Sequence, residues 1–298
     1  MPLSAPVKNA LVGPEGWRAG WRVAAFLILW YASGKVVFPL ASLFYTFTPT
    51  GFTPTDILVY EFVNAVALLV ICLLLAGLER RGPGWFGLGW RRDSLSHFAV
   101  GSVAGFGMVT LLLLACLATG HASVDGLAEH GADLWKYLVV WGLGMLLVGL
   151  GEELQFRGYP LMALGRGIGF WPAAVISSLL FGGEHLAYKP MENVPDILNI
   201  VLLGLMFCYS VRQTGTLWFA IGFHAAFDFF ALSFYGSPNT GNNGLPLEHH
   251  LLDTHIAGPA WLTGGPQGLE ASWLVPPLTL ALCYLIRRLY SQERFPPA

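Results

Sequence analysis

The fold class of this chain follows from residues 135–164, WKYLVVWGLGMLLVGLGEELQFRGYPLMAL. The stretch is apolar over a length that can cross a membrane, because a spanning helix needs about 20 mostly apolar residues. It also contains two adjacent glutamates, Glu152 and Glu153, followed by Arg157. A charged side chain is costly in hydrocarbon unless it is paired or hydrated, so an ionisable residue in a span indicates a function. We therefore expect these three side chains to belong to a functional site.

The composition of the whole chain agrees with a membrane protein. The 298 residues are 55% hydrophobic and 11% charged, and their mean hydropathy is +0.58, whereas a soluble domain has roughly 25% charged residues. We predict an all-α, polytopic protein that forms a single integral membrane domain over residues 1–298. The formal net charge is −2 and no Lys/Arg-rich run occurs, which argues against nucleic acid as a partner.

Apolar segments of spanning or nearly spanning length recur along the chain, and three of them are short or interrupted. Eight spans are predicted, over residues 21–46, 57–78, 96–119, 135–164, 171–187, 196–212, 215–235 and 271–290. Gly/Pro-rich polar stretches separate them and favour turns. The basic residues that precede the first span resemble a signal peptide, but the span is too long for one and is expected to be retained.

The distribution of basic residues predicts the orientation. Cytoplasmic flanks carry the excess of Lys and Arg. With eight spans and a cytoplasmic N-terminus, every Lys and Arg except Lys35, Lys136 and Lys189 falls on an inner loop or at an inner helix end. We therefore expect both termini in the cytoplasm. The chain shows no organelle signal, which favours a bacterial plasma membrane.

Polar side chains on three of the predicted spans are expected at one depth. At a rise of about 1.5 Å per residue, Glu152 lies about 18 Å and His185 about 20 Å above the cytoplasmic ends of their helices. On the seventh span, His224 and Asp228 lie about 14 and 20 Å above that end. These helices run in different directions, so a common depth predicts a single polar layer.

Helical spacing predicts the pairs within this layer. Residues at i and i+4 are neighbours on a helix, so Glu153 can pair with Arg157, and His224 with Asp228. Glu152 is then left without the arginine. The expected arrangement is a fixed carboxylate beside a reactive one.

These residues form three motifs, each within its own span. The motif EExxxR comprises Glu152, Glu153 and Arg157, FxxxH comprises Phe181 and His185, and HxxxD comprises His224 and Asp228. In this order, and with the FRG sequence after the glutamates, they resemble the CPBP (Abi) family of intramembrane endopeptidases. That family includes CAAX prenyl proteases and bacteriocin-processing enzymes. The resemblance covers residues 135–235, which we treat as the motif core.

The resemblance implies a role for each side chain. Glu152 would be the general base that activates a water, and His185 would help to hold that water. His224 and the residue at position 228 would stabilise the oxyanion. Relatives that cleave prenylated proteins typically have Asn at this position, where the present chain has Asp228. Here Asp228 is expected either to orient His224 as an imidazolium or to ligate a metal.

The preferred prediction is an intramembrane endopeptidase that needs no cofactor and whose site opens to the cytoplasm between the fourth and seventh spans. Its partners would be the lipid bilayer and a peptide or protein substrate, which could be prenylated or membrane-associated. The nearest alternative is a zinc metalloprotease that uses the same residues, since Glu, His and Asp are zinc ligands. The set of candidate ligands is Glu152 or Glu153, His185, His224 and Asp228.

Two further alternatives involve no catalysis by these residues. A transporter or scaffold could use the polar layer to relay protons or to hold a partner helix. The Glu152, Glu153 and Arg157 group could also be an ion-pair network that only locks helix packing. Glu184 is left out of the predicted site, because a pair with Lys189 explains it equally well.

Overall fold

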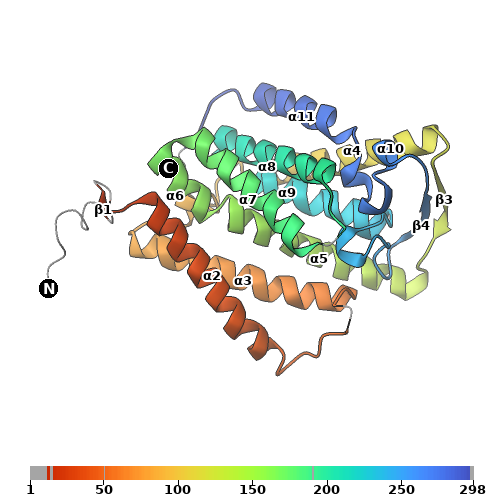
Figure 1. Ribbon diagram of the computed structural model, residues 1–298, viewed down its shortest axis with the longest axis horizontal. Coiled ribbons are helices and arrows are strands. Elements are labelled where there is room, and N and C mark those ends of the chain that lie inside the picture. The colour runs from red at the N-terminus through yellow and green to blue at the C-terminus, as the bar shows by residue number, and fades with distance from the viewer. Residues whose placement is uncertain (1–11, 14–15, 50, 190, 296–298) are drawn as a thin grey trace.

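The structure is a computed structural model that describes residues 12–13, 16–49, 51–189 and 191–295. It is mostly helical, as predicted, and the long helices lie together in one bundle with α2 and α3 along one edge and α11 along the opposite edge (Figure 1). The long helices are α2 (Ala19–Ala41), α3 (Pro54–Leu78), α4 (Ser94–Ala118), α5 (Gly131–Phe156), α7 (Phe170–Tyr188) and α8 (Val194–Thr214). The shorter ones are α6 (Tyr159–Ile168), α9 (Trp218–Asp228), α10 (Ala260–Thr263) and α11 (Val275–Leu289).

The remaining elements are short and lie mainly in the connections. A π-helix, η2 (Phe229–Phe234), continues directly from α9. The antiparallel pairs are β1 (Val12–Gly13) with β2 (Gly16–Trp17) and β3 (Ala122–Leu127) with β4 (Leu252–Ile256). The 3-10 turns are η1 (Pro83–Phe86), η3 (Thr240–Asn242), η4 (Gly265–Gln267) and η5 (Leu269–Ala271).

Each of the eight predicted spans coincides with helix. Among the described residues, 5 helical segments are long and apolar enough to cross a membrane: α2, α3, α4, α5 with α6, and α8. The other three predicted spans correspond to α7, α9 with η2, and α11, which are shorter or less apolar. The count of eight spans and the cytoplasmic position of the termini therefore stay predictions, and Lys8 lies outside the described residues.

The predicted span over residues 135–164 is wrong in one respect, because it is two helices rather than one. Helix α5 ends at Phe156, and α6 begins at Tyr159. Pro160 lies in the first turn of α6, where a missing N–H is tolerated. Gly158 packs so closely on the backbone of Leu154 that a side chain there would clash. The break leaves Arg157 at the C-terminal end of α5, beside the glutamates.

Close packing of α4 fixes the position of α9. A Cβ atom on Gly101 would clash with the carbonyl group of Phe219, and one on Gly105 would clash with that of Phe223. Gly222 approaches the carbonyl group of Phe98 in the same way. Small residues allow helix backbones to approach closely in membrane proteins. These contacts hold α9, the helix that carries His224, against α4.

The bundle has two chemically different ends. At one end, which we call the basic end, Arg22 pairs with Glu79, Arg212 with Glu293 and Arg294 with Asp93. At the other end, which we call the loop end, the sheet of β3 and β4 and the connection over residues 235–274 cover the helices (Figure 1).

Candidate active site

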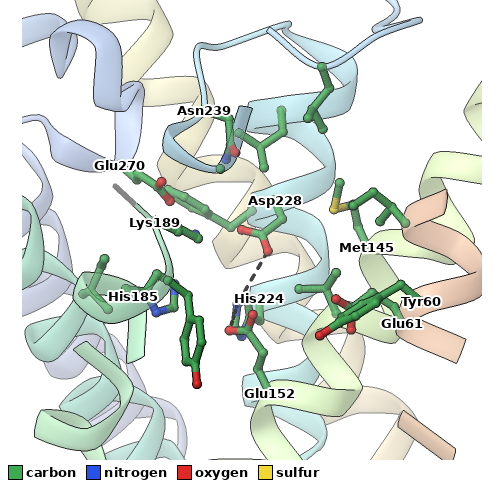
Figure 2. A pocket seen from close by; sticks show the side chains of 18 of the residues that line it. Tyr60, Glu61, Met145, Glu152, His185, Lys189, His224, Asp228, Asn239 and Glu270 are labelled. Carbon is green, nitrogen blue, oxygen red and sulfur yellow. Dashed lines mark ion pairs between the residues drawn. The ribbon is translucent and has the colours of Figure 1, made fainter. Parts of the chain in front are cut away.

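A cavity of about 550 Å³ lies inside the bundle and contains the predicted polar layer (Figure 2). Side chains of α3, α5, α7, α8 and α9 form its walls, and residues from the loop end complete it. The residues that carry ionisable groups are Tyr60, Glu61, Glu152, His185, Tyr188, Lys189, His224, Asp228 and Glu270. Helices that are distant in sequence thus direct charged groups into one apolar enclosure.

His224 lies at the centre of the polar layer. Its Nδ1 atom is 3.0 Å from Oε1 of Glu153. Its Nε2 atom is 3.5 Å from Oε2 of Glu152 and 3.5 Å from Oδ2 of Asp228. The ring of Phe207 stacks on the imidazole with an interplanar angle of 16°. The imidazole is therefore held in one plane, with Nε2 between two carboxylates (Figure 2).

Glu153 and Arg157 form the ion pair expected from their spacing. Nη1 of Arg157 is 3.2 Å from Oε1 of Glu153, and both side chains are fully buried. The guanidinium also lies over the ring of Phe181, 4.3 Å from its centroid. The same Glu153 oxygen contacts His224, which the sequence did not predict. Glu153 therefore links the arginine to the histidine and does not face the cavity.

Glu152 has a different environment from its neighbour. Its side chain keeps 26% of its surface exposed and lines the cavity. Oε2 is buried and has no hydrogen-bond partner among the described residues, and it lies 3.5 Å from Nε2 of His224. A carboxylate with unused acceptor capacity beside a cavity can accept a proton from a bound water.

His185 faces the cavity from α7. Its Nδ1 atom is 3.0 Å from the carbonyl oxygen of Phe181, one turn earlier, so this nitrogen carries the proton and donates to the carbonyl. Nε2 is then an acceptor on the neutral ring. The structure thus brings all six predicted site residues into one region, with Glu152, His185, His224 and Asp228 on the cavity wall and Glu153 and Arg157 behind it.

Several cavity residues were not predicted. Tyr60 and Glu61 on α3 lie across the cavity from His185 (Figure 2). Glu61 is an acidic residue in a predicted span, and that signal alone could have identified it. At the loop end, burial raises the pKa of Glu270 to about 7. Burial alone would lower the pKa of Lys189, but nearby carboxylates, chiefly that of Glu270, raise it.

Glu184 has a partner other than the expected Lys189. Nε2 of Gln155 donates to both carboxylate oxygens of Glu184, at 2.9 and 3.0 Å. This contact joins α7 to α5 beside the polar layer. Glu184 therefore has a packing role that the spacing along α7 could not reveal.

Nε2 of His224 lies 3.5 Å from a carboxylate oxygen of both Glu152 and Asp228, but the predicted zinc ligands do not all come close to one another. Among the described residues, the one set of three or more His, Cys, Asp or Glu donors within 4.8 Å of one another is Asp125, Asp253 and His255. These three side chains are exposed on β3 and β4. The donors of the polar layer do not converge to that extent in this arrangement of side chains.

Comparisons with known proteins find a family model that is similar to most of the motif core. The chain is 27% identical over 179 residues to the uncharacterized protein YyaK of Bacillus subtilis (strain 168). This match covers 58% of the present chain and 56% of that protein, so the chain spans little more than half the length of this relative. Residues 134–230 match the family described as type II CAAX prenyl endopeptidase Rce1-like. This range contains every motif residue of the cavity, so the similarity to the Rce1-like endopeptidases covers the polar layer.

Proposed function

We propose that this protein is an intramembrane endopeptidase in which Glu152 activates a water for attack on a peptide bond. The observation that carries the proposal is the position of Glu152. Its side chain lines the cavity, and Oε2 lacks a hydrogen-bond partner within the described part of the chain and lies 3.5 Å from Nε2 of His224. A base and a cationic or hydrogen-bond-donating group close together are what hydrolysis of a peptide bond requires.

The remaining residues of the layer support this base. Nε2 of His185 can accept a hydrogen bond from the attacking water, because its Nδ1 donates to the backbone. His224 in its imidazolium form donates from Nε2 and stabilises the oxyanion that develops on the substrate carbonyl. Glu153 is held by Arg157 and accepts from Nδ1 of His224, so it fixes the ring and favours its charged form.

Asp228 acts in this mechanism through His224. A carboxylate cannot donate a hydrogen bond to an oxyanion unless it is protonated. Oδ2 of Asp228 lies 3.5 Å from Nε2 of His224, where it can orient the imidazolium between the substrate and the layer. We therefore assign oxyanion stabilisation to His224 and positioning to Asp228.

The proposal is tested with purified protein in detergent and a pool of fluorogenic peptides. We expect Glu152→Gln to lower the cleavage rate by about 10²-fold or more, because the general base is lost. Glu184→Gln is the matched control, since Glu184 is also a carboxylate of the bundle but is bound by Gln155 rather than placed beside His224. Cleavage by the Glu152→Gln protein at the native rate would refute the proposed mechanism.

A zinc-dependent mechanism is the second candidate, and the hydrogen bonding of the histidines favours it. Histidines that ligate metals usually donate their other ring nitrogen to a carboxylate or a carbonyl group. Nδ1 of His224 contacts Glu153 and Nδ1 of His185 contacts the Phe181 carbonyl. Nε2 of both rings, with Glu152 and Asp228, would hold the ion, which would supply Lewis-acid activation of water.

Asp228→Asn separates the two candidates. In the glutamate mechanism the amide keeps the shape of the side chain, and its Oδ1 can still accept from Nε2 of His224, so we expect the rate to fall less than about tenfold, or about 1.4 kcal/mol of barrier. In the zinc mechanism the rate should collapse, recover in part with added Zn²⁺, and be abolished in the native protein by chelators. A large loss that zinc does not restore, with a shifted pH optimum, would show that the charge of Asp228 on His224 is essential.

A further inference from the structure

Glu61 is a second carboxyl group of the cavity that the proposed mechanism leaves unused. It lies on α3, which is long and apolar enough to cross a membrane. Its side chain lines the cavity and also a second hollow of about 520 Å³ between α2, α3, α5 and α7, and Glu152 lines the same two hollows. An ionisable side chain in a span is costly to maintain without a function. Packing alone therefore does not account for Glu61.

Glu61 lies close to the proposed base. A Cβ atom on Gly151, the residue before Glu152, would be 3.8 Å from Oε2 of Glu61. This is an ordinary contact distance, so the carboxyl group of Glu61 rests against the backbone of α5 one residue before Glu152. Figure 2 shows Glu61 and Glu152 on the cavity wall, with Glu61 across the cavity from His185. The two carboxyl groups therefore face the same enclosed space.

The surroundings of the two carboxyl groups differ in charge. The side-chain hydrogen bond of Glu61 within the described residues comes from Nδ2 of Asn64, at 3.5 Å, and is long. Glu152, by contrast, lies 3.5 Å from Nε2 of His224. Two carboxylates in one poorly hydrated space do not both ionise readily, and a cation beside Glu152 favours the negative charge there. The proton of the pair is therefore held on Glu61.

The other ionisable groups that face this space do not supply a positive charge to Glu61. They are Tyr31 and Lys35 on α2, Tyr60 on α3, Glu184, His185, Tyr188 and Lys189 on α7 or at its end, His224 and Asp228 on α9, and Glu270 in η5. Within the described ranges of the chain, no nitrogen of these lysines and histidines lies within 4.0 Å of an oxygen of Glu61. A neutral Glu61 is thus the form that these contacts favour.

We propose that Glu61 is the general acid that protonates the leaving amine, an assignment that rests on the proposed function. Glu152 removes a proton from the attacking water, whose oxygen forms a bond to the carbonyl carbon, and the carbonyl oxygen becomes an oxyanion beside His224. When the C–N bond breaks, the oxyanion forms the carbonyl group again and Glu61 gives its proton to the amine nitrogen. The proton held by Glu152 then passes to Glu61 through a water in the cavity, and both groups regain their starting charges.

The leaving group of the substrate distinguishes an acid from a group that only supports the site. An amine departs from the tetrahedral intermediate only with a proton, whereas a nitrophenolate departs as a stable anion. We therefore compare a peptide with the nitrophenyl ester of the same acyl segment. Glu61→Gln, which keeps the shape of the side chain but has no acidic proton, should slow cleavage of the peptide by about 10²-fold and of the ester by less than about tenfold.

The pH profile gives a second readout that a structural role would not move. Cleavage of the peptide by the native protein should fall as the pH rises through the ionisation of Glu61, because the protonated form is required. This alkaline limb should be absent for Glu61→Gln. Glu184→Gln is the matched control, since Glu184 also lines the second hollow but is bound by Gln155, and it should retain the native rates and the limb.

Infrared difference spectra of native protein against Glu61→Gln test the protonated state without any measurement of activity. We expect the variant to lose a carbonyl band of a protonated carboxylic acid at neutral pH. Absence of this band, native cleavage of the peptide by Glu61→Gln, or an equal loss on peptide and ester would overturn the proposal while the proposed function stands. If the native protein cleaves neither substrate, the proposed function fails and the acid role fails with it.

Discussion

The basic end and the polar layer both contain ion pairs between arginines and carboxylates, but the ratio of positive to negative side chains differs between them. At the basic end, Arg22 and Arg81 both lie within 4 Å of Glu79, and Arg91 and Arg294 both lie beside Asp93. Burial alone would raise the pKa of Asp93, but the hydrogen bond from Arg294 and nearby positive charges lower it. Glu79 and Asp93 thus each have more than one arginine.

The polar layer has the opposite balance. Glu152, Glu153 and Asp228 share one arginine and one histidine. Charges withdrawn from water are costly unless paired, so uncompensated carboxylates inside a bundle reduce its stability. We therefore interpret the ion pairs at the basic end as structural. The polar layer, by contrast, retains the carboxylate of Glu152, which packing does not need. This contrast is the physical reason for assigning chemistry to Glu152.

The largest effect on stability is expected for Arg157→Met. The substitution keeps the buried volume but leaves Glu153 without its fully buried partner. Removing one member of such a pair should lower the free energy of unfolding by about 3–5 kcal/mol. Thermal unfolding in detergent measures the loss.

The double variant Arg157→Met with Glu153→Gln is the control, and it should recover much of that stability, because it removes the orphaned charge. A stable Arg157→Met protein with no activity would instead place the arginine among the catalytic groups.

An intermediate effect is expected for Gly105→Ala, which tests how far the polar layer depends on the packing behind it. The added methyl group would meet the backbone of Phe223 and Phe227 and push α9 away from α4. Overpacking of this kind costs about 1–3 kcal/mol, and the shift of His224 should lower activity more than stability. Gly107→Ala on the same helix meets nothing within 4 Å and should change neither. If Gly105→Ala and Gly107→Ala had equal activity and equal stability, the α4–α9 contact would not position the site.

The smallest effect is expected for Arg212→Ala at the basic end. Its pair with Glu293 is short, at 2.7 Å, but the glutamate is 48% exposed. Exposed ion pairs contribute about 0–1 kcal/mol, so the melting temperature should hardly change and activity should be unaltered. A loss of stability as large as that of Arg157→Met would contradict the distinction between the basic end and the polar layer.

Much of the site could be predicted from the sequence because it depends on spacing within single helices. The pairs Glu153–Arg157 and His224–Asp228 follow from i,i+4 geometry, and the structure contains both. The contact between Glu153 and His224 could not be predicted, since it depends on how α5 and α9 are rotated against each other.

The direction in which the cavity extends also required the structure. Hydropathy locates the spans but carries no information about which loops fold over the bundle, so Asn239 and Glu270 gave no signal. Gly158 and Pro160 signal the break between α5 and α6, although the apolar pattern of the sequence continues through it. Glu61 was detectable by its charge, although only the structure places it in the cavity.

The central claim is that Glu152 is kept for chemistry at the expense of stability, and it is tested by measuring unfolding and cleavage on one preparation of Glu152→Gln. Removal of a charge from a layer rich in carboxylates should leave the free energy of unfolding unchanged or raise it by about 1 kcal/mol. Cleavage should fall by about 10²-fold or more in the same sample. Retained cleavage, or a loss of stability equal to that of Arg157→Met, would contradict the account.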